Sequence, residues 1–330
     1  MNEAQPLSGD PFARLSNAER ALLRPAPLPE RVEAMKAVLT DERFSDAAWL
    51  FERKLDGIRC IAIKADREVR LLSRNHRSLD ARFPEIAAAL AADPAKNLVL
   101  DSEVVAFSGG QTSFERLQRA AGRPAAIYLY AFDLLYLAGY DTTALPLHAR
   151  RRLLRKAVGF RGALRLIPSR KRDGERLYED ACGRGWEGLI AKRGDAPYTH
   201  GRSRDWLKFK CTAEQELVIG GFTAPRGSRS DLGALLLGHY EDGRLRYAGK
   251  VGTGFTAAAL ADLAVRLAPL RRANTPFDDD AVRETHVTWV EPELVAQVAF
   301  TEWTRDGRLR HPRYLGLRDD KPAAEVVRER

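Results

Sequence analysis

The sequence of 330 residues has few cysteines, no long apolar run and no recognisable leader. Cys60, Cys182 and Cys211 lie far apart and form no CxxC pair, which excludes the usual zinc and dithiol redox motifs, and we expect buried or incidental thiols. Without a run of about 18 apolar residues the chain offers no membrane-spanning helix. Residues 1–12 also lack the basic and apolar segments of a signal peptide. We therefore expect a cytoplasmic protein with no membrane partner.

The charge balance is strongly positive. Lysine and arginine total 54 against 45 acidic residues, which gives a net charge of +9. This excess favours a polyanionic partner, although an anionic membrane surface or an acidic protein would satisfy it as well. The hydrophobic content of 45% is ordinary, so a chain of this length can form two domains with their own cores.

The pattern of apolar residues predicts an α+β fold with largely antiparallel sheets, because several strand-like runs follow one another with no room for a helical crossover. Helical patterns are few: SNAERALL with a Ser16–Glu19 capping spacing, PEIAAALAA at 84–92, and TSFERLQRAA at 112–121 with Thr112 and Glu115 in the same spacing. The predicted strands are WLFERKL, RCIAIKA, EVRLLSR, NLVLDSEVVAF, AIYLYAFDLLYL, GWEGLIAKR and RDWLKFK.

After Cys211 the sequence changes to short strands and glycine turns. QELVIGGF, GALLLGHY and RLRYAGKVG are predicted strands, and Asp242-Gly243 is a strong hairpin turn. One helix interrupts them, with Leu260, Leu263 and Leu267 on one face. Short strands with a single helix predict a small β-barrel such as an OB-fold. We divide the chain into an N-terminal arm (1–45), an α+β domain (46–212) and a barrel domain (213–330).

The stretch KLDGIR at 54–59 places charged residues between two apolar runs. Asp56-Gly57 can form a solvated turn that leaves Lys54 and Arg59 in water. The alternative is a site that needs an amine held between two strands.

Other charged residues interrupt apolar strands further along the chain, namely Glu103, Glu187, Lys208 and Lys210. Lys208 and Lys210 are two apart and therefore project from the same strand face. Trp206 shares that face, whereas Leu207 and Phe209 occupy the other. This pattern fits an exposed sheet face and fits equally a cationic surface backed by a core.

Seven motifs follow one another in a fixed order: KLDGIR (54–59), LLSRN (71–75), LDSE (100–103), AFDLLY (131–136), EGLIAK (187–192), WLKFK (206–210) and RDDK (318–321). With them the chain resembles the covalent nucleotidyltransferases, and most closely the ATP-dependent DNA ligases of the bacterial ligase D type. The match runs from Glu52 to Lys321 and is especially close near the end, in RHPRYLGLRDDK. It implies a nucleotidyltransferase (adenylation) domain followed by an OB-fold domain.

The resemblance implies that Lys54 attacks the α-phosphorus of ATP to form lysyl-AMP. The AMP then passes to a 5′-phosphate, and a 3′-hydroxyl displaces it to seal the strand. Only a free amine can attack, so we expect nearby positive charge to lower the pKa of Lys54. Lys208, Lys210 and a divalent metal would supply that charge and also neutralise the α-phosphate.

The remaining site residues also come from the resemblance. We expect Glu52 at the adenine amino edge, Phe132 stacked on the ring, Glu103 near the ribose or metal, Glu187 on Mg²⁺ or Mn²⁺, Arg59 and Arg74 on phosphates, Lys192 on the nucleotide, and Arg318 with Asp320 and Lys321 on the leaving pyrophosphate. We expect Asp133 to be a structural hydrogen-bond partner and not a site residue. The arginine run RRRLLRK at 150–156 is interpreted as a solvated helix face.

One position departs from the family pattern. Ser102 stands where the family commonly has glycine, which puts the local loop conformation in question more than the chemistry.

Other readings come from the same superfamily and from outside it. An RNA ligase or an mRNA capping guanylyltransferase shares the lysine motif, and a non-catalytic OB-fold protein that binds nucleic acid is the alternative from another class. The NAD-dependent branch is disfavoured because its preceding module and four-cysteine zinc site are missing.

The expected partner is double-stranded DNA with nicks or ends, which places the protein at the nucleoid. Ku and other repair proteins of non-homologous end joining are further candidate partners. We expect a monomer, either a stand-alone ligase or a domain excised from a larger ligase D protein.

Overall fold

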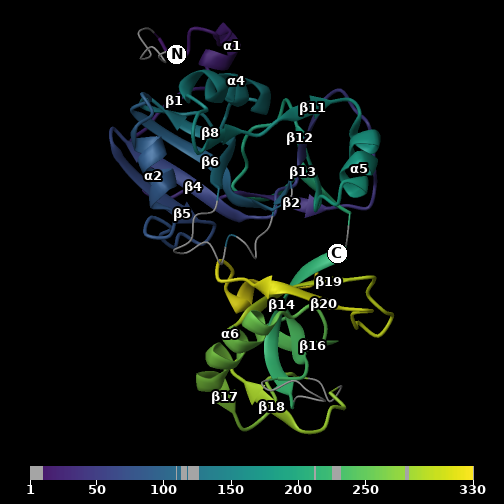
Figure 1. Ribbon diagram of the computed structural model, residues 1–330. Coiled ribbons are helices and arrows are strands. Elements are labelled where there is room, and N and C mark those ends of the chain that lie inside the picture. The colour runs from purple at the N-terminus through teal and green to yellow at the C-terminus, as the bar shows by residue number, and fades with distance from the viewer. Residues whose placement is uncertain are drawn as a thin grey trace. The chain divides into compact units, whose positions relative to one another are not determined.

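The structure is a computed structural model that describes residues 10–108, 110–112, 117, 126–211, 213–224, 232–278 and 282–329. The chain divides into two compact units, Met1–Cys211 and Thr212–Arg330 (Figure 1). Each unit has a hydrophobic core of its own, and each is described by itself.

The first unit contains an eight-stranded sheet with the order β1-β9-β8-β6-β4-β5, to which β10 adds beside β8 and β7 beside β6. Only the β10–β8 pair is parallel among the pairs described in this sheet. The strands are β1 (Arg24–Pro25), β4 (Ile58–Ala65), β5 (Glu68–Ser73), β6 (Asn97–Ser108), β7 (Gln111–Thr112), β8 (Ile127–Leu137), β9 (Tyr140–Asp141) and β10 (Leu164–Leu166).

A second sheet of five strands has the order β11-β3-β12-β13-β2. Its outermost strand β2 lies within the expected arm and pairs in parallel with β13. Part of residues 1–45 therefore completes this sheet. The strands are β2 (Met35–Leu39), β3 (Trp49–Arg53), β11 (Ser169–Lys171), β12 (Gly188–Arg193) and β13 (Gly201–Lys210).

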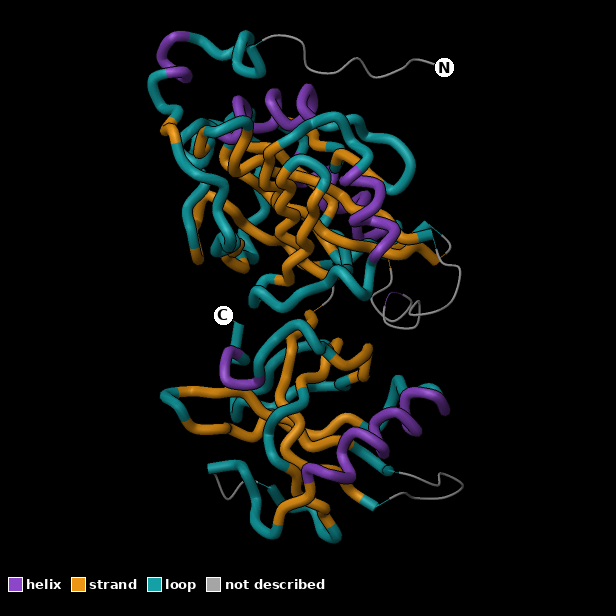
Figure 2. Tube along the Cα trace, turned by 90° about the vertical axis from the view of Figure 1, so that its left-hand side faces the viewer, coloured by secondary structure: helices purple, strands orange, loops and turns teal. Residues whose placement is uncertain are grey.

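The two sheets face each other across a shared apolar cluster. Ile61, Ile63 and Phe132 of the larger sheet pack there with Met35 and Trp206 of the smaller one. Helices cover the outer faces: α2 (Pro84–Ala91) and α4 (Leu147–Ala157) pack on the larger sheet, and α5 (Gly174–Gly183) packs on the smaller one (Figure 1). In Figure 2 the strands of this unit accordingly lie between helices. The space between the sheets is thus bordered by strand residues from both.

Helix boundaries follow the expected local signals. Helix α1 (Asn17–Arg20) begins with the predicted capping box between Ser16 and Glu19, and α2 has Pro84 in its first turn. Most of TSFERLQRAA lies outside the described residues, and Thr112 at its start belongs to β7. Helix α5 was not predicted.

Two glycines of the sequence motifs are required by close packing. A Cβ atom on Gly57 would lie 2.3 Å from the carbonyl oxygen of Val104, and one on Gly188 would lie 1.8 Å from that of Phe209. Any side chain at these positions would push neighbouring strands apart. The glycine of KLDG therefore lets its own backbone lie against β6, and the glycine of EGLIAK lets β12 lie against β13.

Ser102 lies within β6 and not in a loop, so the question about local loop conformation does not arise. Its buried hydroxyl donates a hydrogen bond of 2.6 Å to the carbonyl oxygen of Cys60. Its φ angle is not positive, since Ser102 is absent from the left-handed positions of the chain. An extended strand accepts serine as readily as glycine, and the serine adds a hydrogen bond.

Cysteine pairing corrects the sequence expectation. Cys182 at the end of α5 and Cys211 after β13 form a disulfide with Cα atoms 5.1 Å apart, although 29 positions separate them in the chain. Only the packing of α5 on the smaller sheet brings them together, which spacing along the sequence does not reveal. Cys60 is a buried free thiol, as expected.

The second unit has a seven-stranded sheet ordered β16-β15-β14-β18-β17, and β19 joins β14 to β20. At Asp242-Gly243 both residues have positive φ, at 51° and 75°, which confirms the predicted hairpin turn. Helix α6 (Ala257–Leu267) starts at its Thr256 cap and buries Leu263 and Leu267. The strands are β14 (Ala213–Thr223), β15 (Leu235–Glu241), β16 (Arg244–Val251), β17 (Arg271–Arg272), β18 (Val287–Val290), β19 (Val295–Phe300) and β20 (Arg313–Leu317).

Among the described residues, no helix is both long enough and apolar enough to cross a lipid bilayer.

Candidate active site

Three neighbouring strands bring the lysines of two motifs together. The backbone NH of Lys54, just after β3, donates to the carbonyl oxygen of Gly188 in β12 at 2.9 Å. Gly188 in turn lies opposite Lys210 in β13, and Ile190 lies opposite Lys208. The KLDG, EGLIAK and WLKFK motifs therefore meet at one end of the smaller sheet.

The side chain of Lys54 forms an ion pair with Oε1 of Glu187. Both side chains are largely enclosed, with exposures of 20% and 11%. Burial lowers the pKa of Lys54, but attraction and the hydrogen bond from Glu187, with help from Asp56 and Glu103, outweigh burial and leave the pKa raised. The expectation of a lowered pKa is therefore wrong for this arrangement, because the nearest charge is a carboxylate.

Glu187 keeps one oxygen for another partner. Its Oε2 is buried and accepts no hydrogen bond from the described residues. A buried carboxylate oxygen without a donor is costly and suits a cation that a substrate brings with it.

The faces of β13 follow the predicted alternation. Leu207 and Phe209 pack with α5 residues on the outer side, whereas Trp206 belongs to the cluster between the sheets. Lys208 and Lys210 follow Trp206 at intervals of two residues and so face the space between the sheets. Both ammonium groups therefore lie on the same side of the sheet as Lys54.

Glu52 is the centre of a buried ionic cluster. Arg151 donates to its Oε1, and the Lys192 ammonium lies 2.8 Å from its Oε2. Burial lowers the pKa of Lys192, and Glu52 opposes that effect. Glu52 and Lys192, which the sequence placed separately on the nucleotide, are thus direct neighbours.

Arg151 is a member of this cluster that the sequence analysis did not single out. Besides Glu52 it donates to the carbonyl oxygens of Phe132 (3.2 Å) and Ile167 (2.9 Å) and to Ser169 Oγ (3.2 Å). Its guanidinium joins α4, β8 and β3 around the position expected for adenine. In the sequence, the only sign of this role is that Arg151 lies in a helical segment that follows the strand motif AFDLLY.

The interpretation of the arginine run as a solvated face is wrong for two of its residues. Arg150 and Arg151 are 0% and 4% exposed. Arg150 makes two hydrogen bonds to the buried carboxylate of Asp133, at 2.7 and 2.8 Å. Both guanidiniums are buried because α4 packs against β8, where a carboxylate and a carbonyl oxygen accept their hydrogen bonds. Asp133 has the structural role given to it from the sequence.

The ring of Phe132 has two cationic side chains near it. The Lys192 ammonium is 4.0 Å from the ring centroid and the Arg59 guanidinium is 4.7 Å from it. Trp206 meets the same ring edge-on at 6.0 Å. A base stacked on Phe132 would replace one of these cation–π contacts.

Arg59 is tied to the buried Asp101. Its Nε and Nη2 each lie 2.5 Å from a carboxylate oxygen, and Nη2 also donates to the carbonyl oxygen of Met35. Tyr198 donates to the same carboxylate at 2.7 Å. Burial lowers the pKa of Arg59, but Asp101, with help from Tyr198 and Glu103, outweighs burial and leaves the pKa raised. Asp101 is a second residue that the sequence did not single out, although it belongs to LDSE.

Arg74 and Glu103 belong to the larger sheet and its border. Arg74 follows β5, and its Nε and Nη2 are buried with no hydrogen-bond partner among the described residues. Glu103 lies in β6 opposite Arg59 in β4. A guanidinium without an acceptor is suited to an anion from the substrate.

The C-terminal motif belongs to the second unit. Arg318 forms two hydrogen bonds of 2.9 Å with Asp320, and Lys321 pairs with Glu216 at 2.7 Å. These local pairs fix the side chains of RDDK within that unit.

Comparisons with known proteins agree with this geometry. Residues 27–210 match the family model of the ATP dependent DNA ligase domain, and residues 228–321 match that of the ATP dependent DNA ligase C terminal region. The multifunctional non-homologous end joining protein LigD of Pseudomonas aeruginosa is 41% identical over 314 residues, which cover 92% of this chain and 37% of LigD. The corresponding DNA repair protein LigD of Mycobacterium tuberculosis is 42% identical over 291 residues, or 85% and 37%.

A solved structure supports the same assignment. Mycobacterial DNA ligase D complexed with ATP and MES is 36% identical, with a TM-score of 0.65, over 90% of this chain and 98% of that chain. The chain spans little more than a third of the length of the LigD proteins it matches. With the ligase domain model matching more than half of its residues, the chain belongs to the ATP-dependent DNA ligase family.

Proposed function

We propose that this protein is an ATP-dependent DNA ligase that seals a 5′-phosphate to a 3′-hydroxyl through lysyl-AMP and a DNA-adenylate. The observation that carries the proposal is the enclosed Lys54–Glu187 pair at the end of β12, whose neighbour β13 carries both Lys208 and Lys210. An amine at this place can attack a phosphorus whose negative charge the two further lysines stabilise.

The first chemical step requires Lys54 to lose its proton. In the ion pair the proton stays on Lys54, and the arrival of positive charge at Glu187 would weaken the pair and let the proton pass to water. The free amine then bonds to the α-phosphorus of ATP while pyrophosphate leaves. Arg318 and Lys321 are proposed to orient the pyrophosphate.

The nucleotide contacts proposed from the family motifs fit the cluster around Glu52. Its carboxylate accepts from the amino group of adenine, with Phe132 against the ring and Lys192 beside them. Glu103 binds near the ribose, and Arg59 and Arg74 contact phosphate. Arg74 has buried donors available for this purpose.

A divalent metal fits the residues present. The described residues contain no group of three or more acidic, histidine or cysteine side chains that would hold a metal by themselves. Magnesium is commonly bound by one or two carboxylates together with substrate phosphates, and the open Oε2 of Glu187 is such a donor. Glu187 and Glu103 would hold Mg²⁺ or Mn²⁺, which would supply charge neutralisation at the phosphates.

For the second unit we propose an OB-fold barrel. Two backbone hydrogen bonds connect the β19–β20 segment to β16: Leu309, between β19 and β20, donates to Ala248 in β16, and Tyr314 in β20 donates to Thr253 just after β16. Such links between the first and last strands support closure of the sheet.

The proposed substrate is double-stranded DNA with nicks or ends, bound mainly through its backbone as the net charge of +9 favours. The relatives named LigD act in non-homologous end joining, and we extend that pathway to this chain, with Ku as a candidate partner and a monomeric state.

The proposal is tested by incubating the full chain with ATP labelled at the α-phosphate and a divalent metal. The wild type should become covalently labelled, Lys54→Ala should not, and Lys96→Ala, which alters an exposed lysine, should label normally. Labelling from GTP in preference to ATP would favour the guanylyltransferase alternative. A wild-type chain that stays unlabelled would reject the enzyme.

A further inference from the structure

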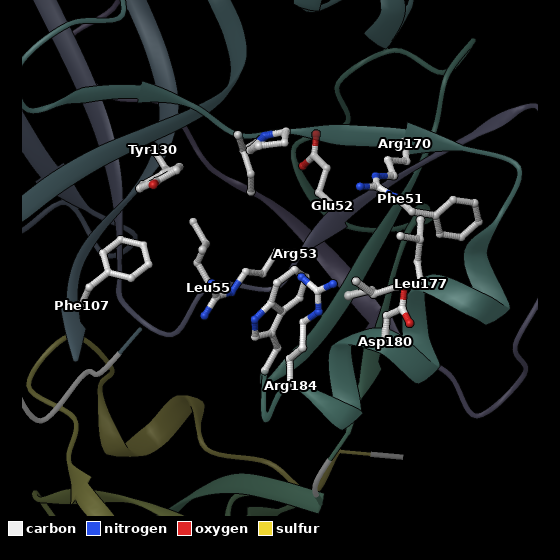
Figure 3. A pocket seen from close by; sticks show the side chains of 14 residues that line it. Phe51, Glu52, Arg53, Leu55, Phe107, Tyr130, Arg170, Leu177, Asp180 and Arg184 are labelled. Atoms are coloured by element: carbon white, nitrogen blue, oxygen red, sulfur yellow. The ribbon is translucent and has the colours of Figure 1, made fainter. Parts of the chain in front are cut away.

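A pocket lies beside the smaller sheet, with Phe107 and Tyr130 of the larger sheet in its wall, and apart from Glu52 its lining residues are outside the proposed catalytic set. It has a volume of about 370 Å³. Figure 3 shows Arg53 near its middle, with Phe107 and Tyr130 on one side and Arg170 on the other. Its lining does not include Lys54, Phe132, Lys208 or Lys210. A concave site of this size can enclose a small ligand.

Alternation along β3 separates Arg53 from the nucleophile. Phe51 and Arg53 lie on the face that α5 covers, where Phe51 packs against Phe209, whereas Glu52 turns to Lys192 on the opposite face. Arg170 lies opposite Phe51 in β11 and joins the same side. Adjacent residues in KLDG and its flank thus serve two different sites.

The pocket has an excess of positive charge. Arg53, Arg170 and Arg184 line it together with Asp180 and Glu52. Glu52 is already neutralised by Arg151 and Lys192. Arg53 and Arg170 form no ion pair with any residue that the structure describes. The side chains therefore favour an anionic ligand.

Arg53 is held in place without a charged partner. Its guanidinium lies 4.5 Å from the ring centroid of Trp186 and 5.8 Å from that of Phe107, and its buried Nε donates to none of the described residues. Burial lowers the pKa of this guanidinium. An enclosed cation against aromatic rings is costly unless an anion reaches it.

Arginine planes, aromatic rings and apolar walls together match one kind of ligand. Bases stack on aromatic side chains and on guanidinium planes, and phosphates pair with arginine. A base within a duplex remains stacked and cannot enter a closed pocket, whereas an unpaired base can. On the proposed function of DNA sealing, the polynucleotide substrate supplies such bases at overhanging ends.

We propose that the pocket of Arg53, Arg170, Arg184 and Trp186 binds one unpaired nucleotide of the DNA substrate, as a site that shares only Glu52 with the proposed ATP site. An end with an overhang then makes one contact more than a plain nick. The pocket would favour substrates with single-stranded extensions.

Binding of the full-length chain to two fluorescent duplexes tests this inference. One duplex carries a nick only, and the other carries the same nick with a short single-stranded overhang. The wild type should bind the overhang duplex about tenfold more tightly, in line with the loss on removing one stacked base. Arg170→Ala and Arg184→Ala should each remove most of that difference and leave binding of the plain nick unchanged.

The control is Arg176→Ala, which removes an exposed arginine of α5 that does not line the pocket and should bind both duplexes as the wild type does. Labelling by ATP confirms that each variant is folded. Equal wild-type affinity for the two duplexes, or equal weakening by Arg170→Ala and Arg176→Ala, would overturn the inference while the ligase proposal stands. A loss of ATP labelling in Arg170→Ala would assign the pocket to ATP and also overturn it.

Discussion

At the scale of single residues, the chemistry depends on what lies next to Lys54. A cationic neighbourhood alone would lower its pKa, but Glu187 is the group in contact and raises it. The amine is thus stored as an ammonium ion. A raised pKa also means that the pair stabilises the folded chain fully at pH values below the pKa of an ordinary lysine. This stabilisation is lost as the pH rises through the raised pKa of Lys54.

The rate of self-adenylylation should therefore increase with pH. Because only the free amine attacks, kcat/KM for ATP should rise about tenfold per pH unit between pH ~7.5 and pH ~9.5. This range lies above the phosphate ionisation at about pH 6, so that ionisation does not contribute to the slope. Glu187→Gln should move this profile to lower pH, since the effect of burial on the pKa is then opposed only by Asp56 and Glu103. Single-turnover labelling across pH measures both, and a flat wild-type profile would contradict the role given to the pair.

At the scale of elements, α4 brings Arg150 and Arg151 into the core beside the proposed nucleotide site. Its sequence is rich in arginine, which suggested a solvated surface. The residues at 150 and 151 instead enter the core, since the helix packs on β8 with its leucines and carries these two side chains inward with them. Helix periodicity is clear in LHARRRLLRKA, but which polar residues meet buried acceptors depends on the strand beneath.

Arg151→Ala should therefore lower stability and nucleotide affinity together. It leaves the Glu52 carboxylate with Lys192 alone and two carbonyl oxygens without their donor. Removing one partner from a buried ion pair costs about 3–5 kcal/mol. Urea unfolding should show this loss, and labelling against ATP concentration should show a raised KM.

The neighbouring Arg152→Ala provides the comparison. Arg152 is 39% exposed and pairs with Glu19, so its loss should change stability by about 1 kcal/mol or less and leave the KM for ATP unchanged. If both variants behaved alike, the assignment of Arg151 to the nucleotide site would fail.

At the scale of the whole molecule, the proposed reaction needs both units. Lys54, Glu187, Lys208 and Lys210 belong to the first, whereas Arg318 and Lys321 belong to the second. Lys54 pairs with Glu187 inside the first unit, and Arg318 pairs with Asp320 inside the second. The steps that use ATP and those that use DNA-adenylate can thus be separated by mutation.

Arg318→Ala should abolish labelling by ATP and still seal a nick that is already adenylylated, because pyrophosphate leaves only in the first step. A gel assay on both substrates measures this. Arg310→Ala, which removes another arginine with a local acidic partner, Glu302, should retain both activities. Equal loss of labelling and sealing in Arg318→Ala would reject the proposed role of RDDK.

The sequence by itself determined the strands of its longest apolar runs, the alternation that puts Trp206, Lys208 and Lys210 on one face, the hairpin at Asp242-Gly243 and the order of the motifs. These are local properties of residue type and spacing. Only the tertiary structure decided that Glu187 neutralises Lys54, that Arg151 holds Glu52 and that Cys182 meets Cys211. Each of those contacts joins positions at least 29 residues apart, and their energies depend on burial, which no local pattern reports.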